Sequence, residues 1–167
     1  ERLLQEIGGK GPVVVLTHRP HPGVLARTLT FLDMLKGYPN VKVVAERHIN
    51  VPGPIENARV QMENILLANP AKGSIAGVWA AFDAAAIGAT QAIMAAGRTE
   101  IKVTGVDGEA QALKLIREGS PLVATVGQDF EQIPGTLARQ ISLVLDGKPA
   151  QGTQIFVRAV LMTKANA

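Results

Sequence analysis

Residues 12–40 read PVVVLTHRPHPGVLARTLTFLDMLKGYPN, and this stretch decides the fold class. The apolar run at 13–16 lacks alternation, which is typical of a parallel strand covered on both faces. From 24 to 36 the apolar residues recur with the 3.6-residue period of a helix, which GYPN at 37–40 ends. A strand followed at once by a helix is the repeating unit of an α/β protein.

The same unit recurs along the whole chain. The pattern predicts further strands at 41–46, 75–81, 101–106, 122–126 and 154–162, and helices at 1–7, 55–67, 84–96, 109–118 and 131–145. Alternation with short connections predicts a three-layer α/β fold with a doubly wound parallel sheet and right-handed crossovers.

Composition narrows the possible classes of protein. The chain has 167 residues, 47% of them hydrophobic, and 17 basic against 14 acidic residues give a net charge of +3. The basic residues are scattered, so no nucleic-acid partner is expected. Cysteine is absent, which excludes disulfide scaffolds and thiolate sites but leaves both cytosol and periplasm open. The opening ERLLQEI reads as the end of a helix, so we expect a processed or truncated chain.

Polar and aromatic residues follow the predicted strands, where ligands bind in open α/β sheets. They are His18, Arg19 and His21 after the first strand, Phe82 and Asp83 after the third, Asp107 after the fourth, and Gln128 and Asp129 after the fifth. A ring of hydrogen-bond donors and acceptors around one phenylalanine suits a polyhydroxylated ligand.

Several of these residues have a plainer interpretation. Asp83 directly precedes a predicted helix, which favours a helix N-cap over a ligand contact. Asp107, within GVDG at 105–108, either holds its own loop or contacts a ligand, and both interpretations stay open. Arg27 has the ordinary interpretation of a surface arginine. The pair His18 and His21 lacks a third ligand nearby, so no metal site is predicted.

Signatures of catalysis are missing from the sequence. GGKG at 8–11 precedes a strand instead of following one, which is the wrong context for a phosphate-binding loop. None of the three serines, Ser74, Ser120 and Ser142, lies in a Gly-x-Ser-x-Gly elbow. We therefore expect a binding protein with no cofactor, and not an enzyme.

Seven short segments of the chain together resemble those of a known protein family. They are WAAFDAAAIGA at 79–89, AAGR at 95–98, VTGVDG at 103–108, IREG at 116–119, ATVGQD at 124–129, GK at 147–148 and LMTKAN at 161–166. In order and spacing they resemble the periplasmic sugar-binding proteins of bacterial ABC transporters, of the ribose and galactose/glucose type. That family of type I periplasmic binding proteins has two flavodoxin-like lobes joined by three crossing strands, and this chain resembles the carboxyl-terminal lobe.

The resemblance implies an organisation and a set of partners. Residues 1–128 would form the carboxyl-terminal lobe, 129–152 would cross to an amino-terminal lobe, and 153–167 would be the return strand. The protein would bind a sugar or polyol in the periplasm and deliver it to the membrane permease of an ABC importer.

The resemblance also assigns roles within a candidate ligand site. Asp107 would be the acidic sugar contact and Gln128 the amide contact at the hinge. HP at 21–22 followed by ART at 26–28 resembles the glucose/galactose receptors, in which this His and Arg contact sugar hydroxyls, so His21 and Arg27 join the site. Phe82 stands where these receptors usually have Asn, and its ring would suit a different polyol or a deoxy sugar.

Two alternatives and one structural question remain. The core of a LacI-like regulator shares the fold but also needs a helix-turn-helix, which these residues do not supply. A flavodoxin-like interaction module would need a phosphate loop or an acidic cluster where 18–23 reads HRPHPG. The predicted helix 131–145 has an unpartnered apolar stripe, which we expect to fold back on its own sheet or to pack in a homodimer. The stripe consists of Ile133, Leu137, Ile141, Val144 and Leu145.

Overall fold

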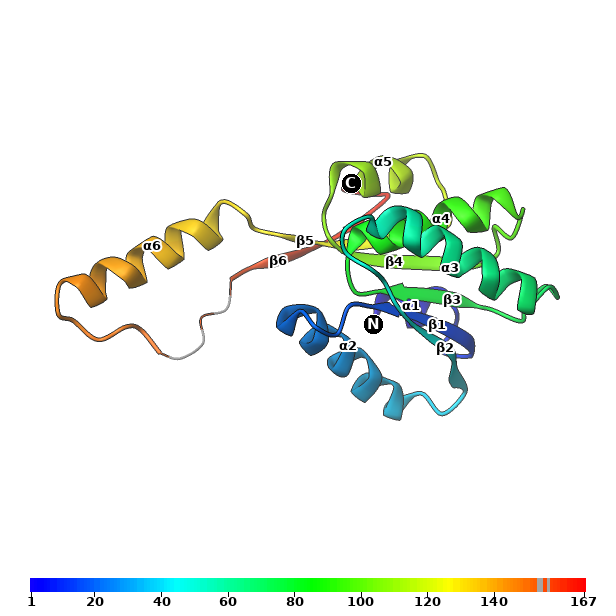
Figure 1. The fold of residues 1–167 in the computed structure, drawn as a ribbon, viewed down its shortest axis with the longest axis horizontal. Helices are drawn as coiled ribbons and strands as arrows, with labels where there is room; N and C mark the ends of the chain where they lie inside the picture. Colours follow the sequence, from blue (N-terminus) through cyan, green and yellow to red (C-terminus); the bar gives the residue numbers. More distant parts are fainter. Residues whose placement is uncertain (153–154, 156) are drawn as a thin grey trace.

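The computed structural model describes residues 1–152, 155 and 157–167 and shows one sheet with helices on both faces (Figure 1). The strands are β1 (Gly11–Thr17), β2 (Val41–His48), β3 (Gly77–Ala80), β4 (Lys102–Asp107), β5 (Leu122–Gln128) and β6 (Ala159–Thr163). The helices are α1 (Arg2–Glu6), α2 (Pro22–Met34), α3 (Pro54–Ala68), α4 (Asp83–Ala95), α5 (Ala110–Arg117) and α6 (Gln132–Leu145), with a short 3₁₀ turn at Leu35–Gly37. In the described part of the chain, every helix is too short or too polar to cross a bilayer.

The sheet has the strand order β2-β1-β3-β4-β5-β6, and its first five strands are parallel, as predicted. The chain moves outward from β1 to β2 and then returns past β1 to β3. This reversal creates a topological switch point between β1 and β3, where open α/β sheets form their ligand crevice.

The last strand does not follow the predicted parallel pattern. β6 pairs with β5 in the antiparallel direction, with Val126 opposite Leu161. The physical reason is that α6 does not cover the sheet, so the chain re-enters the lobe at the edge from which it left. The strand predicted at 154–162 is also too long, because β6 begins at Ala159, while residues 153, 154 and 156 lie outside the described residues.

Side chains of β1 alternate between two core layers. Val14 and Leu16 pack in the larger layer beneath α3, α4 and α5, whereas Val15 packs with Leu3 and Phe31 from α1 and α2. The run at 13–16 is fully buried, as expected for a strand with helices on both sides. The Phe31 ring stacks on Trp79 with centroids 4.6 Å apart, which fixes α2 against β3.

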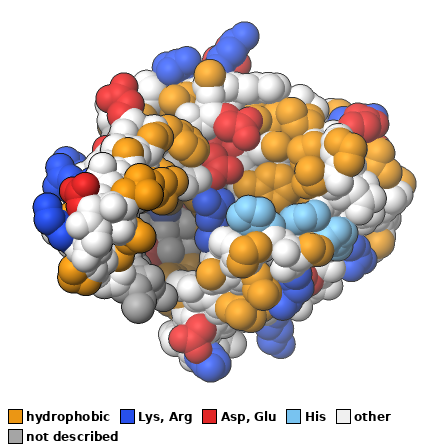
Figure 2. Space-filling view, turned by 60° about the vertical axis from the view of Figure 1, so that its left-hand side comes forward, with side chains coloured by type: hydrophobic (Ala, Val, Ile, Leu, Met, Phe, Trp, Pro, Cys, Tyr) orange, Lys and Arg blue, Asp and Glu red, His pale blue; other side chains and the backbone are white. Residues whose placement is uncertain are grey.

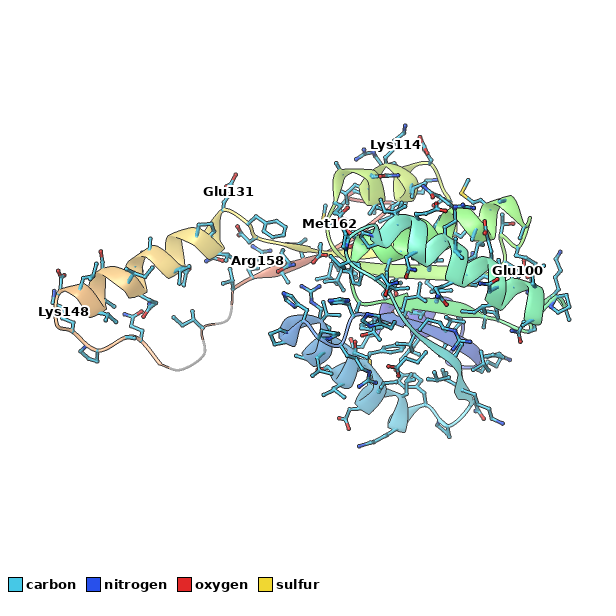
Figure 3. All side chains as sticks on the ribbon, in the orientation of Figure 1. Glu100, Lys114, Glu131, Lys148, Arg158 and Met162 are labelled. Atoms are coloured by element: carbon cyan, nitrogen blue, oxygen red, sulfur yellow. The ribbon has the colours of Figure 1, made fainter. Side chains whose placement is uncertain are left out.

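The helix α6 extends away from the lobe (Figure 1), and every one of its residues is at least partly exposed. Figure 3 labels Glu131 and Lys148 near the two ends of this projecting segment, whereas Met162 lies where β6 enters the lobe. Its apolar stripe stays open to solvent, with 59% exposure at Leu137 and 81% at Leu145. The helix therefore does not fold back on its own sheet.

The helices α3 and α4 approach each other closely at Gly88. A Cβ at this position would lie 2.1 Å from the carbonyl oxygen of Ile55 and 3.0 Å from the Ala58 side chain. Only glycine fits this contact, although glycine has a poor helix propensity.

Gly88→Ala should therefore destabilise the protein by about 1–3 kcal/mol through overpacking, despite the better helix propensity of alanine. Denaturant unfolding measures the change. Gly135→Ala in α6 is the matched control, because a Cβ there meets no atom within 4 Å and should cost nothing. Equal stability of the Gly88→Ala variant and the wild type would contradict the close approach of α3 and α4.

Candidate functional site

A pocket of about 480 Å³ lies at the carboxyl edge of the parallel strands. Its lining residues are His18, His21, Val24, Arg27, Val51, Phe82, Asp107, Gln128 and Phe130. All five residues of the predicted site therefore lie together. Figure 2 shows histidine side chains beside basic and acidic side chains at a hollow in this face of the molecule.

Asp107 is the centre of the polar side chains in the pocket. Its Oδ1 accepts hydrogen bonds from Arg27 Nη1 at 3.1 Å and from Gln128 Nε2 at 2.5 Å. Arg27 Nη1 also donates to the carbonyl oxygen of Ala81 at 2.9 Å, which ties α2 to the end of β3. Within the described residues, the hydrogen bonds to Asp107 go to Oδ1, so Oδ2 is available to a ligand donor.

The backbone of Asp107 has a conformation that residues with a side chain rarely adopt, with φ at 135°. A residue with a Cβ is strained in this region, and such strain clusters at functional sites. Gly108 follows with φ at 79°, and a Cβ there would lie 2.8 Å from the Cα of Gly127. The turn after β4 is thus pressed against β5.

The two histidines of the pocket have opposite hydrogen-bonding character. His21 Nδ1 accepts from the Val24 amide at 3.3 Å, which caps α2 and places the proton of the neutral ring on Nε2. His18 Nδ1 lies 2.9 Å from the carbonyl oxygen of Ile49 and must donate to it, so its Nε2 is an acceptor. The neutral pair therefore supplies one donor and one acceptor.

The apolar part of the pocket includes three residues that the sequence did not assign to the site: Val24, Val51 and Phe130. Val51 lies beyond the end of β2 and is apolar, so a search for polar and aromatic residues directly after the strands does not select it. Phe130 lies two residues beyond β5 and is 61% exposed. His18 was recognised as a strand-end residue but was not assigned to the site.

Asp83 is not the helix N-cap that the sequence favoured. The N-cap of α4 is Phe82, and Asp83 is the first helical residue, with a fully buried side chain. Its carboxylate accepts instead from the amides of Gly108 and Glu109, each at 2.8 Å, and from Thr125 Oγ1 at 2.7 Å. The physical reason is that Gly105 leaves room for this carboxylate above β4.

Two other strand-end residues lie outside the pocket lining. Arg19 forms an ion pair with Glu46 at 2.6 Å on the surface. Asp129 Oδ1 accepts from the amides of Glu131 and Gln132, and so holds the turn before α6. Among the residues that the structure describes, no group of three His, Cys, Asp or Glu side chains could hold a metal ion.

Burial raises the pKa of two carboxyl groups beneath the pocket. Desolvation raises the pKa of the Asp83 carboxyl, and its hydrogen bonds with Thr125 and two backbone amides oppose this rise. The pKa of Glu109 is also raised, first by desolvation and then by repulsion from Asp83 and Asp107. Three carboxylates thus lie close together at the ends of β3 and β4.

This topology and this pocket are those of an open α/β domain with a small-molecule crevice at its switch point. The chain belongs to the periplasmic binding protein domain family, whose model matches residues 1–149. The resemblance seen in the sequence is thereby confirmed, and the fold is that of one lobe of such a protein.

Three known relatives are similar along almost the whole chain. An ABC transporter solute-binding protein from Agrobacterium vitis, solved with bound allitol, superposes with a TM-score of 0.92 at 36% identity, covering 98% of this chain and 57% of that one. The D-apiose import binding protein of Actinobacillus succinogenes is 30% identical over 100% of this chain and 53% of its own length. The xylitol-binding protein of Mycolicibacterium smegmatis is 27% identical over 99% of this chain and 46% of its own.

The chain thus spans about half the length of these curated relatives. Their names describe binding proteins and not enzymes, which agrees with the class of protein expected from the sequence.

The raised pKa of Glu109 predicts a pH-dependent effect of its removal. The folded state holds the Glu109 proton more tightly than the unfolded state, so ionisation of Glu109 above the raised pKa destabilises the fold. Glu109→Gln should stabilise the protein at neutral pH by about 0.2–1 kcal/mol, a range limited by solvent screening at this exposed residue. The gain should disappear as the pH falls below the ordinary value of 4.5.

Urea unfolding at several pH values measures this gain. Glu118→Gln is the control, because Glu118 is an exposed partner of Lys114 at 3.9 Å and its removal should give no gain at any pH. A gain for Glu109→Gln that stays constant between pH 4 and 7 would contradict the raised pKa of Glu109.

Proposed function

We propose that this chain is the carboxyl-terminal lobe of a periplasmic solute-binding protein that binds a neutral sugar or polyol without chemical change. The ligand would be delivered to the membrane permease of an ABC importer. Relatives with bound allitol, or named for D-apiose and xylitol, support this class of ligand.

The observation that carries the proposal is the Arg27–Asp107 pair beside Phe82. The two opposite charges are 3.1 Å apart, so the pocket offers strong hydrogen-bonding groups with little net charge. A neutral ligand with several hydroxyl groups can both donate to Asp107 Oδ2 and accept from the free guanidinium nitrogens. Phe82 offers an apolar ring that can cover the C–H face of such a ligand.

The two histidines of the pocket also suit a neutral ligand with several hydroxyl groups. His21 Nε2 is a donor and His18 Nε2 an acceptor, while the Gln128 side-chain oxygen supplies a further acceptor. Hydroxyl groups satisfy both kinds of partner, whereas a carboxylate or phosphate would leave the acceptors unpaired.

The remainder of the chain would complete a two-lobed receptor. We assign the lobe to residues 1–128, the crossing segment to 129–152 and the returning segment, which contains β6, to 153–167. The exposed stripe of α6 and the open pocket would then both be covered by an amino-terminal lobe. A closed receptor buries its ligand between two lobes, so this chain alone supplies only part of the contacts.

Binding by the isolated chain should accordingly be weaker than micromolar, the affinity that corresponds to roughly 8 kcal/mol. Calorimetry with allitol, xylitol and D-apiose tests this, with the same titrations on the chain joined to an amino-terminal lobe. Micromolar binding by the isolated chain would contradict the division of the site between two lobes. No binding of any sugar or polyol by the two-lobed protein would contradict the proposed function.

Asp107→Ala should weaken binding to the two-lobed protein by about 10–100-fold, because it removes a charged acceptor and the ion-pair partner of Arg27. The matched control is Asp146→Ala, which removes an exposed carboxylate at the end of α6 that forms an ion pair with Lys148 at 3.6 Å. Equal affinities of the Asp107→Ala variant and the wild type would remove Asp107 from the site.

The isolated chain should form a homodimer through α6, since large apolar side chains left in water each forfeit about 1.5–3 kcal/mol. Light scattering should give twice the monomer mass. The double variant Leu137→Glu and Ile141→Glu should be monomeric, and Arg139→Glu, on the opposite side of the same helix, should remain dimeric. A monomeric wild-type chain, cleaved rapidly by protease near Phe130 and Gly147, would contradict the dimer.

A further inference from the structure

A buried carboxylate lies beneath the pocket without contributing to its lining. Asp83, at the start of α4, is fully buried. Its Oδ1 accepts from Thr125 Oγ1 on β5, and its Oδ2 accepts from the amides of Gly108 and Glu109 after β4. One side chain at the start of α4 thus joins the turn after β4 to the middle of β5.

The two amides bound by Oδ2 belong to the residues directly after Asp107. Asp107 has φ at 135°, a conformation that persists only where the surrounding structure over-determines it. Arg27 and Gln128 bind the side chain of Asp107 and not its backbone. The hydrogen bonds of Asp83 hold the backbone itself, within two residues of the strained position.

A glycine on β4 leaves the space that this carboxylate occupies. A Cβ at Gly105 would lie 2.1 Å from Asp83 Oδ1, so glycine on β4 is required for the carboxylate to reach Thr125. The Gly108 amide also lies 3.4 Å from Thr125 Oγ1, which adds a weaker contact to the same turn. Desolvation raises the pKa of Asp83, so a carboxylate is kept here against an energetic cost.

We propose that Asp83 is a positioning residue that holds the turn after β4 in the strained conformation of Asp107. The turn then presents the Asp107 carboxylate to Arg27 and Gln128. As far as it concerns a ligand, this inference rests on the proposed function. The holding of the turn does not depend on any ligand.

The test compares Asp107→Ala with Asp107→Gly in three Asp83 backgrounds and in one control background. Both variants remove the carboxylate, and they differ only in the Cβ, which is strained at positive φ. With Asp83 present, Asp107→Gly should have a melting temperature about 2–4 °C above that of Asp107→Ala. With Asp83→Ala, the turn can relax to negative φ, and Asp107→Ala should become the more stable of the two.

Asp83→Asn is the conservative background. Its amide oxygen can still accept from the two backbone amides, but less strongly than a carboxylate, while its amino group can donate to Thr125. The difference between the two Asp107 variants should therefore be intermediate. If Asp83→Ala does not fold, the Asp83→Asn background is used instead. A smaller difference in melting temperature between Asp107→Gly and Asp107→Ala in that background then supports the positioning role of Asp83.

Thr125→Val is the control for a general loss of stability. It removes the bond to Oδ1 and the weaker contact with the Gly108 amide but leaves both amide bonds to Oδ2. All variants should therefore melt earlier, while most of the difference in melting temperature between Asp107→Gly and Asp107→Ala persists. A difference that stays the same in every Asp83 background would overturn the proposal, since Asp83 would then stabilise the fold without holding the turn.

Allitol titration of the two-lobed protein adds the ligand readout. Asp83→Ala should weaken binding nearly as much as Asp107→Ala, about 10-fold or more, and Asp83→Asn should restore most of it. Unchanged binding in a folded Asp83→Ala variant would overturn the role in ligand presentation. If the wild type binds neither allitol nor any other polyol, the proposed function fails, while the melting series still judges the positioning role.

Discussion

The burial of β1 on both faces is the constraint on which the rest of the structure depends. Val13, Val14, Val15 and Leu16 are fully buried, so helices must cover both sides of the sheet. A chain that places helices on both sides reaches its next strand by a crossover, which makes neighbouring strands parallel. Parallel strands then end at one edge, and the polar residues that follow them meet there.

This constraint explains how much of the site could be predicted from the sequence. His21, Phe82, Asp107 and Gln128 come from separate elements, and the strand-end rule selected all four, which line one pocket. Arg27 lies within α2, and only the resemblance to the glucose/galactose receptors assigned it to the site. The rule works because an uninterrupted apolar run such as 13–16 marks both the strand and its end. It missed Val51 and Phe130 because both lie beyond the ends of their strands, β2 and β5.

Other features could not be predicted because they depend on contacts between distant residues. Asp83 looked like a helix cap, because a local pattern cannot reveal that glycine at 105 leaves space for its carboxylate to reach Thr125. The direction of β6 likewise depends on α6 lying beyond the sheet, which an amphipathic helix pattern does not specify. Local patterns gave the elements and their order, whereas these partners required the folded structure.

The two edges of the sheet differ in a way that bears on aggregation. At one edge, β2 carries Lys42, Glu46 and Arg47, and charges of this kind oppose pairing with a strand of another molecule. At the other edge, β6 reads AVLMT, without a charge, and exposes Val160 and Leu161 at 39% and 44%. An uncharged, apolar edge is a template for intermolecular strand addition, so the colloidal behaviour of this chain in concentrated solution depends on what lies beside β6.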